Sequence, residues 1–227
     1  MAYYYKAVIF DCDGVLFDSN DLKTAAFRKT LASYPPDIVD KFIVYHKLHG
    51  GISRYIKLNT FIKDFAKESI STIKLKNLLN AYGAICRKMY SSAPLTPGCL
   101  NILELLHKDI SLYVSSGSDE SELKEVLIER KLDRYFKKIY GSPKSKDECV
   151  YEIIKDSGTG RRIVYVGDAE SDLEAAKKAG IEFIFMKRFS DARLQMMEII
   201  KREKKYVIGT LEKLPPLLIK NLKDCDD

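Results

Sequence analysis

Several features that would place a protein in a specialised class are missing from this sequence. Its 227 residues contain no Trp, and its five Cys residues, an odd number, form no CxxC pair and have no nearby pair of His residues. This pattern argues against a zinc site and against a disulfide framework, so we expect reduced thiols. No apolar run approaches the roughly 18 residues that a membrane span needs, and the first residues lack the basic region of a signal peptide.

A strong excess of one charge is also missing. The chain has 38 Lys and Arg residues against 32 Asp and Glu residues, which leaves a net charge of +6. This basic excess is too small to indicate a nucleic-acid partner, and it suits a small anionic molecule equally well. We therefore expect a cytoplasmic protein that binds neither nucleic acid nor membranes, and the sequence leaves its oligomeric state open.

What the sequence does contain is a regular alternation of two patterns. Hydrophobic residues make up 46% of the chain, and five short runs rich in β-branched and aromatic residues predict strands. The runs are Ala7–Phe10, 110–114, 163–166, 183–185 and Tyr206–Ile208. Stretches with helical spacing separate most of them, and such continuous apolar runs are typical of strands covered by helices on both faces. This predicts an α/β fold with a doubly wound, Rossmann-like parallel sheet.

The alternation is interrupted after the first strand. The following stretch contains no second convincing strand, and its apolar residues recur every three or four positions, which predicts helices. The strand pattern resumes only after a stretch with two Pro residues and a Gly at 91–98. We therefore predict two domains: a core formed by residues 1–17 and 94–227, and a small helical cap formed by residues 18–93 and inserted after the first strand.

Acidic residues follow two of the predicted strands at the point where each strand ends. Asp11 and Asp13 come directly after the run 7–10, and Asp168 and Asp172 follow the run 163–166. Each Asp could simply stabilise a turn, but the carboxyl ends of parallel strands are where ligands usually bind. Four carboxylates at one place repel one another unless a cation neutralises them, and oxygen ligands suit Mg²⁺. We expect a magnesium site here.

Two loops add groups that could bind an anion. Residues 114–118 read VSSGS and lie between a predicted strand and a predicted helix, where a hydroxyl and free N–H groups bind anions. Ser118 is also the expected cap of that helix. Residues 141–146 read GSPKSK, so that Lys144 or Lys146 could neutralise both the acidic cluster and a bound phosphate.

At these residues the sequence resembles the haloacid dehalogenase-like hydrolase superfamily. The first motif of that superfamily, DxDGxLxD, stands here as DCDGVLFD at residues 11–18, and the last, GDxxxD, as GDAESD at residues 167–172. The motif order, the strands between the motifs and the helical insert agree over essentially the whole chain. The pattern is most similar to the group of phosphoglycolate phosphatase and β-phosphoglucomutase, which carry a helical cap. The motifs are specific for the superfamily and say little about the substrate.

The resemblance implies a role for each motif residue. It makes Asp11 the nucleophile and Asp13 the general acid and base. The implied phosphate-binding residues are Ser116, Gly117 and Lys146, although Lys144 is close enough to leave the choice of lysine open. The implied magnesium ligands are Asp11, Asp168 and the backbone carbonyl of Asp13, with Asp172 as a further ligand or a support. The implied chemistry is phosphotransfer through an aspartyl-phosphate, because the dehalogenases lack the second Asp.

The helical insert contains a possible substrate-binding loop. Residues 49–54 read HGGISR, which is similar to a cap loop of sugar phosphomutases in which the Arg grips a second phosphate. This makes His49, Ser53 and Arg54 candidate substrate contacts, although the two Gly residues could equally form a turn between helices. The mutases also carry a His after the first motif, where this chain has Lys23. We therefore expect a Mg²⁺-dependent phosphatase of a small phosphorylated metabolite, with a sugar phosphomutase and a non-catalytic phosphate-binding module as alternatives.

Overall fold

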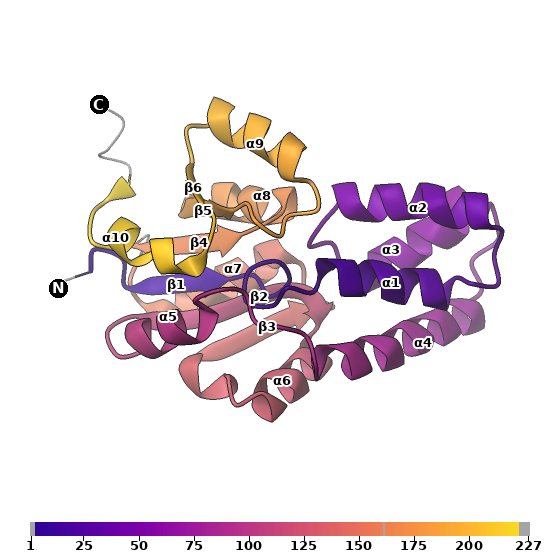
Figure 1. The fold of residues 1–227 in the computed structure, drawn as a ribbon, viewed down its shortest axis with the longest axis horizontal. Coiled ribbons are helices and arrows are strands. Elements are labelled where there is room, and N and C mark those ends of the chain that lie inside the picture. Colours follow the sequence, from indigo (N-terminus) through magenta and orange to yellow (C-terminus); the bar gives the residue numbers. More distant parts are fainter. Residues whose placement is uncertain (1–2, 161, 223–227) are drawn as a thin grey trace.

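The structure, a computed structural model, describes residues 3–160 and 162–222. Figure 1 shows a central sheet with helices on both faces and a group of helices beyond one end of the strands. Six parallel strands pair in the order β3-β2-β1-β4-β5-β6. The strands are β1 (Ala7–Phe10), β2 (Ser111–Asp119), β3 (Lys138–Ser142), β4 (Ile163–Gly167), β5 (Glu182–Met186) and β6 (Tyr206–Ile208). The predicted α/β fold with a doubly wound parallel sheet is confirmed.

Side chains that alternate along each strand feed two separate hydrophobic clusters. In β1, Val8 and Phe10 belong to one cluster, whereas Ala7 and Ile9 belong to the other. Residues of α5 (Cys99–Leu106), α6 (Glu120–Glu129) and α10 (Pro215–Leu218) join the first cluster. Residues of α7 (Lys146–Ser157), α8 (Glu170–Ala179) and α9 (Arg193–Arg202) join the second. Because both faces are covered, the central strands β1 and β4 are apolar throughout rather than alternating with polar residues.

The helices that follow β1 pack around an aromatic centre of their own. They are α1 (Asn20–Thr30), α2 (Pro36–Leu48), α3 (Arg54–Thr60), the π-helical turn η1 (Phe61–Phe65) and α4 (Thr72–Tyr90). The ring of Phe27 lies 5.3 Å from that of Phe42 and 4.1 Å from that of Tyr82, measured between centroids. We call this group the cap helices. They lie within residues 18–93, and the domain boundaries at 17/18 and 93/94 stay a prediction.

The strand order positions the site. From β1 the chain adds β2 and then β3 on one side, and from β4 it adds β5 and then β6 on the other. The direction of winding therefore reverses between β1 and β4, which are neighbours. Ligands of open α/β sheets bind beyond the carboxyl ends of the strands at such a reversal. Asp11 and Asp168, which directly follow β1 and β4, lie at this place.

The structure differs from the sequence predictions at two local points. It adds β3, which contains Lys138 and Gly141 and so lacks a continuous apolar run. The expected helix cap at Ser118 is wrong, because β2 continues to Asp119. The side chain of Asp119 caps α6 instead, accepting hydrogen bonds from the backbone N–H groups of Ser121 and Glu122. A carboxylate accepts two such bonds at once and favours the positive end of the helix.

Two short helical turns complete the fold. The 3₁₀ turns are η2 (Asp133–Tyr135) and η3 (Leu211–Lys213). Within the described residues, no helix has the length and apolar character needed to cross a membrane. Cys12, Cys86, Cys99 and Cys149 are free and buried, and Cys225 lies outside the described residues.

Candidate active site

Three carboxylates from two neighbouring strand ends meet in the interior. Asp11, Asp168 and Asp172 each offer an oxygen that lies within 4.8 Å of the others, and all three side chains are buried. Asp172 sits in the first turn of α8, where its second oxygen accepts a hydrogen bond from the N–H of Ala169 at 3.1 Å. The close approach of β1 to β4 therefore brings together acids that are more than 150 residues apart in the sequence.

Lys146 supplies the positive charge that faces these acids. It is the first residue of α7, a helix start held by a capping box between Ser145 and Glu148. Its Nζ lies 3.2 Å from Oδ1 of Asp11 and forms an ion pair with Asp172. The other candidate, Lys144, lies over the ring of Tyr140 at 5.2 Å from the centroid. Of the two lysines left open by the sequence, the structure brings Lys146 to the acids.

The acids carry more negative charge than one lysine balances. Burial and the nearby Asp172 raise the pKa of Asp11 to about 7, although Lys146 acts against this. Burial and Asp11 together raise the pKa of Asp168 well above its ordinary value. Burial alone would lower the pKa of Lys146, but Asp11 and Asp172 outweigh it and the pKa is raised. A divalent cation would relieve the repulsion between the acids.

The donor set fits Mg²⁺. All the candidate ligands are carboxylate oxygens, which Mg²⁺ prefers. Oδ1 of Asp11 is buried and receives no hydrogen bond of acceptable geometry from any described residue, in spite of the nearby ammonium group. Gly14 leaves the space that this arrangement needs: its φ is +75°, and a Cβ there would lie 2.3 Å from Oδ2 of Asp168. These residues could therefore hold Mg²⁺ between β1 and β4.

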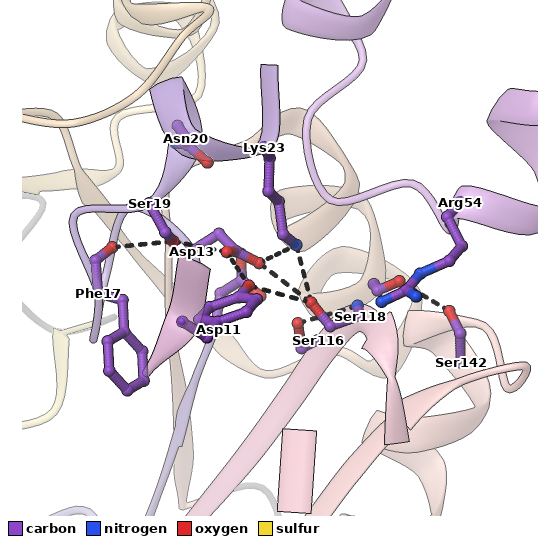
Figure 2. Close-up of polar contacts among 12 residues, drawn as sticks. Asp11, Asp13, Phe17, Ser19, Asn20, Lys23, Arg54, Ser116, Ser118 and Ser142 are labelled. Atoms are coloured by element: carbon purple, nitrogen blue, oxygen red, sulfur yellow. Dashed lines mark hydrogen bonds and ion pairs between the residues drawn. The ribbon is translucent and has the colours of Figure 1, made fainter. Parts of the chain in front are cut away.

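Asp13 lies outside this acid cluster and has different partners (Figure 2). Its carboxylate forms an ion pair with Lys23, and it accepts hydrogen bonds from the hydroxyls of Ser19, Tyr90 and Ser118. Burial by itself would raise the pKa of Asp13, but the charge and hydrogen bond of Lys23 and the hydroxyl donors outweigh burial, so the pKa is lowered. The two motif aspartates therefore differ in environment: Asp11 is drawn toward protonation, and Asp13 is held as a carboxylate.

The predicted phosphate-binding loop lies beside these residues. Ser116 is buried, and its Oγ accepts a hydrogen bond from the N–H of Ser118 at 3.1 Å. Gly117 and Ser118 line the cavity described next, and the carbonyl of Gly117 accepts a hydrogen bond from Ser142 at 2.8 Å. A Cβ on Gly117 would lie 2.2 Å from the carbonyl oxygen of Gly51, so this position has no room for a side chain. The loop is thus fixed from both sides.

A small cavity of about 40 Å³ separates the strand ends from the cap helices. Asp11, Asp13 and Asp168 line it from the sheet, and the Gly50–Gly51 segment lies over it from the cap. Gly51 has a φ of +70°, and a Cβ there would lie 2.6 Å from Nζ of Lys146. The carbonyl of Gly50 accepts a hydrogen bond from the Ser171 hydroxyl of α8 at 3.0 Å. The Gly50–Gly51 segment of the cap therefore contacts the core beside the acids.

The three candidate contacts from the cap lie in different surroundings. Arg54 is buried, lines the cavity and forms an ion pair with Glu122 of α6 at 2.7 Å. Ser53 caps α3, its hydroxyl accepting a hydrogen bond from the N–H of Tyr55. The ring of His49 stacks on Tyr45 and is not among the residues that line the cavity. Only Arg54 of the three lines the cavity among the described residues, and the binding role of all three stays a prediction.

Several lining residues were not identified from the sequence. Lys23 and Asn20 enter from α1: Lys23 binds Asp13, and the Asn20 amide donates to Oδ2 of Asp168 at 2.8 Å. His46 and Lys57 come from α2 and α3. These residues belong to helices with ordinary amphipathic patterns. Lys23 was named from the sequence only as the residue at the place of the mutase His. A further signal was the position of Lys23 and Asn20 within a few residues of the first motif, since a short connection keeps a helix start near the strand end.

Comparisons with known proteins agree with this geometry. A family model described as haloacid dehalogenase-like hydrolase matches residues 8–186. The match covers most of the chain and includes both acidic motifs, so the chain belongs to this hydrolase family and is an enzyme of that kind.

The names of the relatives give a more specific activity than the name of the family. The chain is 30% identical to the phosphoglycolate phosphatase of Aquifex aeolicus (strain VF5) over 187 residues, 77% of this chain and 81% of the relative. It is 28% identical to that of Pseudomonas fluorescens (strain Pf0-1), over 79% of this chain and 68% of the relative. A phosphatase of phosphorylated carbohydrates from Thermotoga maritima is 27% identical, over 79% and 84%. Within the family, the chain therefore resembles phosphatases.

Solved structures show the same fold. A haloacid dehalogenase-like family hydrolase from Streptococcus pneumoniae superposes with a TM-score of 0.70 at 18% identity, over 94% of this chain and 99% of the other. The YfnB protein of Bacillus subtilis, whose structure is described as bound to magnesium and as revealing interdomain movement, gives a TM-score of 0.69 at 18% identity, over 94% and 98%. These similarities support the fold of both the sheet and the cap helices.

Proposed function

We propose that this protein is a Mg²⁺-dependent phosphatase that hydrolyses a small phosphorylated metabolite through an aspartyl-phosphate, in the manner of a phosphoglycolate phosphatase. The observation that carries the proposal is the pair of aspartates at the end of β1, which line one cavity but have different partners. Asp11 lies with acids and Lys146, whereas Asp13 is held by Lys23 and three hydroxyls. The four free Cys residues support a cytoplasmic location.

In this proposal Asp11 is the nucleophile. One of its oxygens attacks phosphorus and forms the aspartyl-phosphate, and the bond from phosphorus to the ester oxygen breaks. Lys146, 3.2 Å from Asp11, offsets the charge on the phosphoryl oxygens, together with the N–H groups of the loop at Gly117. Bound Mg²⁺ would neutralise the acids and the phosphate at the same time. Asp11, Asp168 and the carbonyl of Asp13 would hold it, with Asp172 as a further ligand or support.

Asp13 handles the protons. In the first step it protonates the leaving oxygen, and in the second it accepts a proton from the water that hydrolyses the aspartyl-phosphate. Its lowered pKa suits the second step. For the first step Asp13 needs a proton, which its partners do not supply. Burial alone would lower the pKa of Lys23, but the charge of Asp13 outweighs burial and raises that pKa, and burial raises the pKa of Tyr90 well above its ordinary value. Asp13 therefore takes this proton from solvent before the first step.

The environment of Arg54 favours this function over the mutase alternative. An arginine that grips a second phosphate needs its guanidinium free, but Arg54 is paired with Glu122, and Arg87 contacts the same carboxylate at 3.1 Å. This contact supports a phosphatase. If incubation with a sugar 1-phosphate and a trace of bisphosphate gave isomerised sugar phosphate and no free phosphate, the mutase would replace it.

The test is Asp11→Asn, assayed with an aryl phosphate in Mg²⁺. We expect hydrolysis to fall by at least about a thousandfold, because the amide is a poor nucleophile. The melting temperature should not fall, because the variant removes one of three clustered acids. Asp64→Asn, an exposed acid in η1, is the matched control and should retain full activity. Wild-type turnover by Asp11→Asn would overturn the nucleophile assignment.

A further inference from the structure

The cap side of the cavity contains a buried lysine without an acidic partner. Lys57 of α3 is 3% exposed and lines the cavity. Its ammonium group contacts His46 twice, at Nδ1 (2.8 Å) and at the backbone carbonyl (3.2 Å). No carboxylate of the described residues forms an ion pair with it, whereas the three other cations that line the cavity, Lys23, Lys47 and Arg54, each form at least one. A buried charge is costly unless it is paired, so Lys57 needs an explanation.

His46 presents a second unused donor at the same place. When Lys57 is protonated its ammonium group can only donate, so Nδ1 of His46 then accepts from Lys57 and the ring proton is carried by Nε2. Burial and the neighbouring Lys57 hold the pKa of His46 far below its ordinary value, so the ring is neutral with a single N–H. His46 is 6% exposed and lines the cavity, and Nε2 has no hydrogen-bond partner among the described residues.

Together the two side chains present two hydrogen-bond donors to a bound acceptor. Lys57 uses two of its three N–H bonds on His46 and keeps one free, and His46 keeps Nε2–H free. Donors of this kind, one of them charged, bind an oxyanion such as a carboxylate or a phosphate. Arg54 is not an equivalent receptor, because Glu122 already neutralises it.

We propose that Lys57 and His46 are the specificity-determining residues of the active site and bind a second oxyanion at the end of the substrate opposite the transferred phosphate. This inference rests on the proposed function, because it assumes that the first phosphate binds at Asp11. The oxyanion is a carboxylate or a second phosphate. Esters with an uncharged end leave both donors unpaired, and a site with unpaired buried donors discriminates strongly against such ligands.

The cavity is smaller than the substrates that this proposal requires. One water needs about 10–15 Å³, so a cavity of about 40 Å³ holds three or four waters. A phosphate ester with a two-carbon chain and a second anion has more non-hydrogen atoms than this. Because the Gly50–Gly51 segment contacts the core, the cap helices would have to move away from the strand ends for such an ester to bind.

The experiment compares three esters that share a two-carbon chain: phosphoglycolate, ethylene glycol bisphosphate and ethyl phosphate. For the wild type we expect kcat/KM to be higher for at least one of the two esters with a second anion than for ethyl phosphate. Lys57→Met should lower that value by about tenfold or more, because a charged hydrogen bond is lost. The value for ethyl phosphate should stay within about threefold. If the variant loses the preference for phosphoglycolate over ethyl phosphate, the oxyanion is a carboxylate. If it loses the preference for ethylene glycol bisphosphate, the oxyanion is a phosphate.

Further variants separate this role from a structural one. His46→Leu should show a smaller loss of the same preference, and His46→Gln, which restores a donor, should recover part of it. Lys63→Met, in an exposed part of η1, should leave kcat/KM unchanged for all three esters. Equal losses for all three esters in Lys57→Met, or a wild type without preference, would overturn the proposal.

Failure of the proposed function would give a different result. If the wild type hydrolyses none of the three esters, calorimetry on Asp11→Asn and on Asp11→Asn/Lys57→Met measures binding alone. Tighter binding of an anionic ester than of ethyl phosphate, lost in the double variant, would keep the anion site while the phosphatase assignment fails. Equal binding of all three esters, or none, would overturn the anion site as well.

Discussion

The two walls of the cavity carry opposite charge, and they are built in different ways. The sheet wall presents Asp11 and Asp168, which cluster with Asp172 near the cation Lys146. The cap wall presents Lys57 without an acid. On the sheet wall the excess is negative and suits a metal ion, and on the cap wall the excess is positive and suits an anionic ligand. A phosphate ester with a second anion would meet both requirements.

The comparison also distinguishes the residues that carry out the reaction from those that select the substrate. The sheet wall holds its groups by short backbone connections at strand ends, as with Asp172, whose carboxylate bonds to the N–H of Ala169. The cap wall holds its groups by packing of helices, as with Lys57 against His46. A substitution on the sheet wall should therefore abolish reaction with every substrate, whereas one on the cap wall should change which substrates react.

After Asp11→Asn, the largest effect is expected for Lys146→Met. Among the described residues, Lys146 is the only cation paired with Asp11 and Asp172, so hydrolysis of an aryl phosphate should fall by about a hundredfold or more in this variant. With a chelator present, unfolding by urea should show a loss of about 3 kcal/mol, because buried acids lose their partner.

Lys144→Met is the matched control for this variant. Lys144 lies two residues away over the ring of Tyr140, so its removal should leave both activity and stability close to wild type. Equal effects of the two variants would show that the sheet wall does not depend on Lys146.

An effect of intermediate size is expected on the pH dependence of stability, with and without Mg²⁺. Burial and Asp172 raise the pKa of Asp11 from 3.8 to about 7, so the folded protein binds that proton more tightly than the unfolded chain. Stability should therefore fall, relative to Asp11→Asn, as the pH rises from about 4 to 7. Melting temperatures of both proteins in chelator would measure this.

Adding Mg²⁺ should remove most of that pH dependence in the wild type, because bound cation favours the ionised carboxylates. The lowered pKa of His46 also affects stability in this range, but it is present in both proteins and cancels in the difference. A difference that stays constant with pH, or is the same with and without Mg²⁺, would contradict the metal assignment of the sheet wall.

The smallest effect is expected for the stability of Lys57→Met, which tests the cap wall without any substrate. Burial, followed by the charge of Lys23, lowers the pKa of Lys57 to about 7. Replacing this unpaired charge with an apolar side chain of similar length should raise the free energy of unfolding by about 1 kcal/mol at pH 7. The gain should shrink as the pH rises from 7 toward 10.5, since the unfolded lysine also loses its charge there.

Lys63→Met should give no comparable gain, because Lys63 is exposed. A destabilised Lys57→Met would mean that the contacts of Lys57 with His46 support the cap rather than wait for a ligand.

The sequence predicted the sheet wall in considerable detail. The apolar runs predicted five of the six strands, and the positions of Asp11 and Asp168 directly after two of them predicted that the two acids would meet. β3 was missed because Lys138 and Gly141 interrupt its apolar pattern. The choice between Lys144 and Lys146 stayed open because two residues at a helix start differ in direction only once the helix is placed.

The cap wall could not be predicted in the same way. Arg54 was singled out as a candidate substrate contact and lines the cavity, but its pairing with Glu122 depends on how α3 and α6 pack. His46 and Lys57 are eleven residues apart in two helices, and nothing in their local patterns marks them. Their contact arises because α2 and α3 fold back on each other.

The sequence by itself determined the family of this protein, its α/β sheet and the acids at the strand ends, because a strand end fixes the direction of the next few side chains. The tertiary structure alone decided that Lys23 holds Asp13, that Glu122 occupies Arg54, and that Lys57 and His46 face the cavity with donors unused. The physical reason is the range of the interactions: a short backbone connection is written in consecutive residues, whereas the surroundings of a side chain on a helix depend on the packing of distant segments.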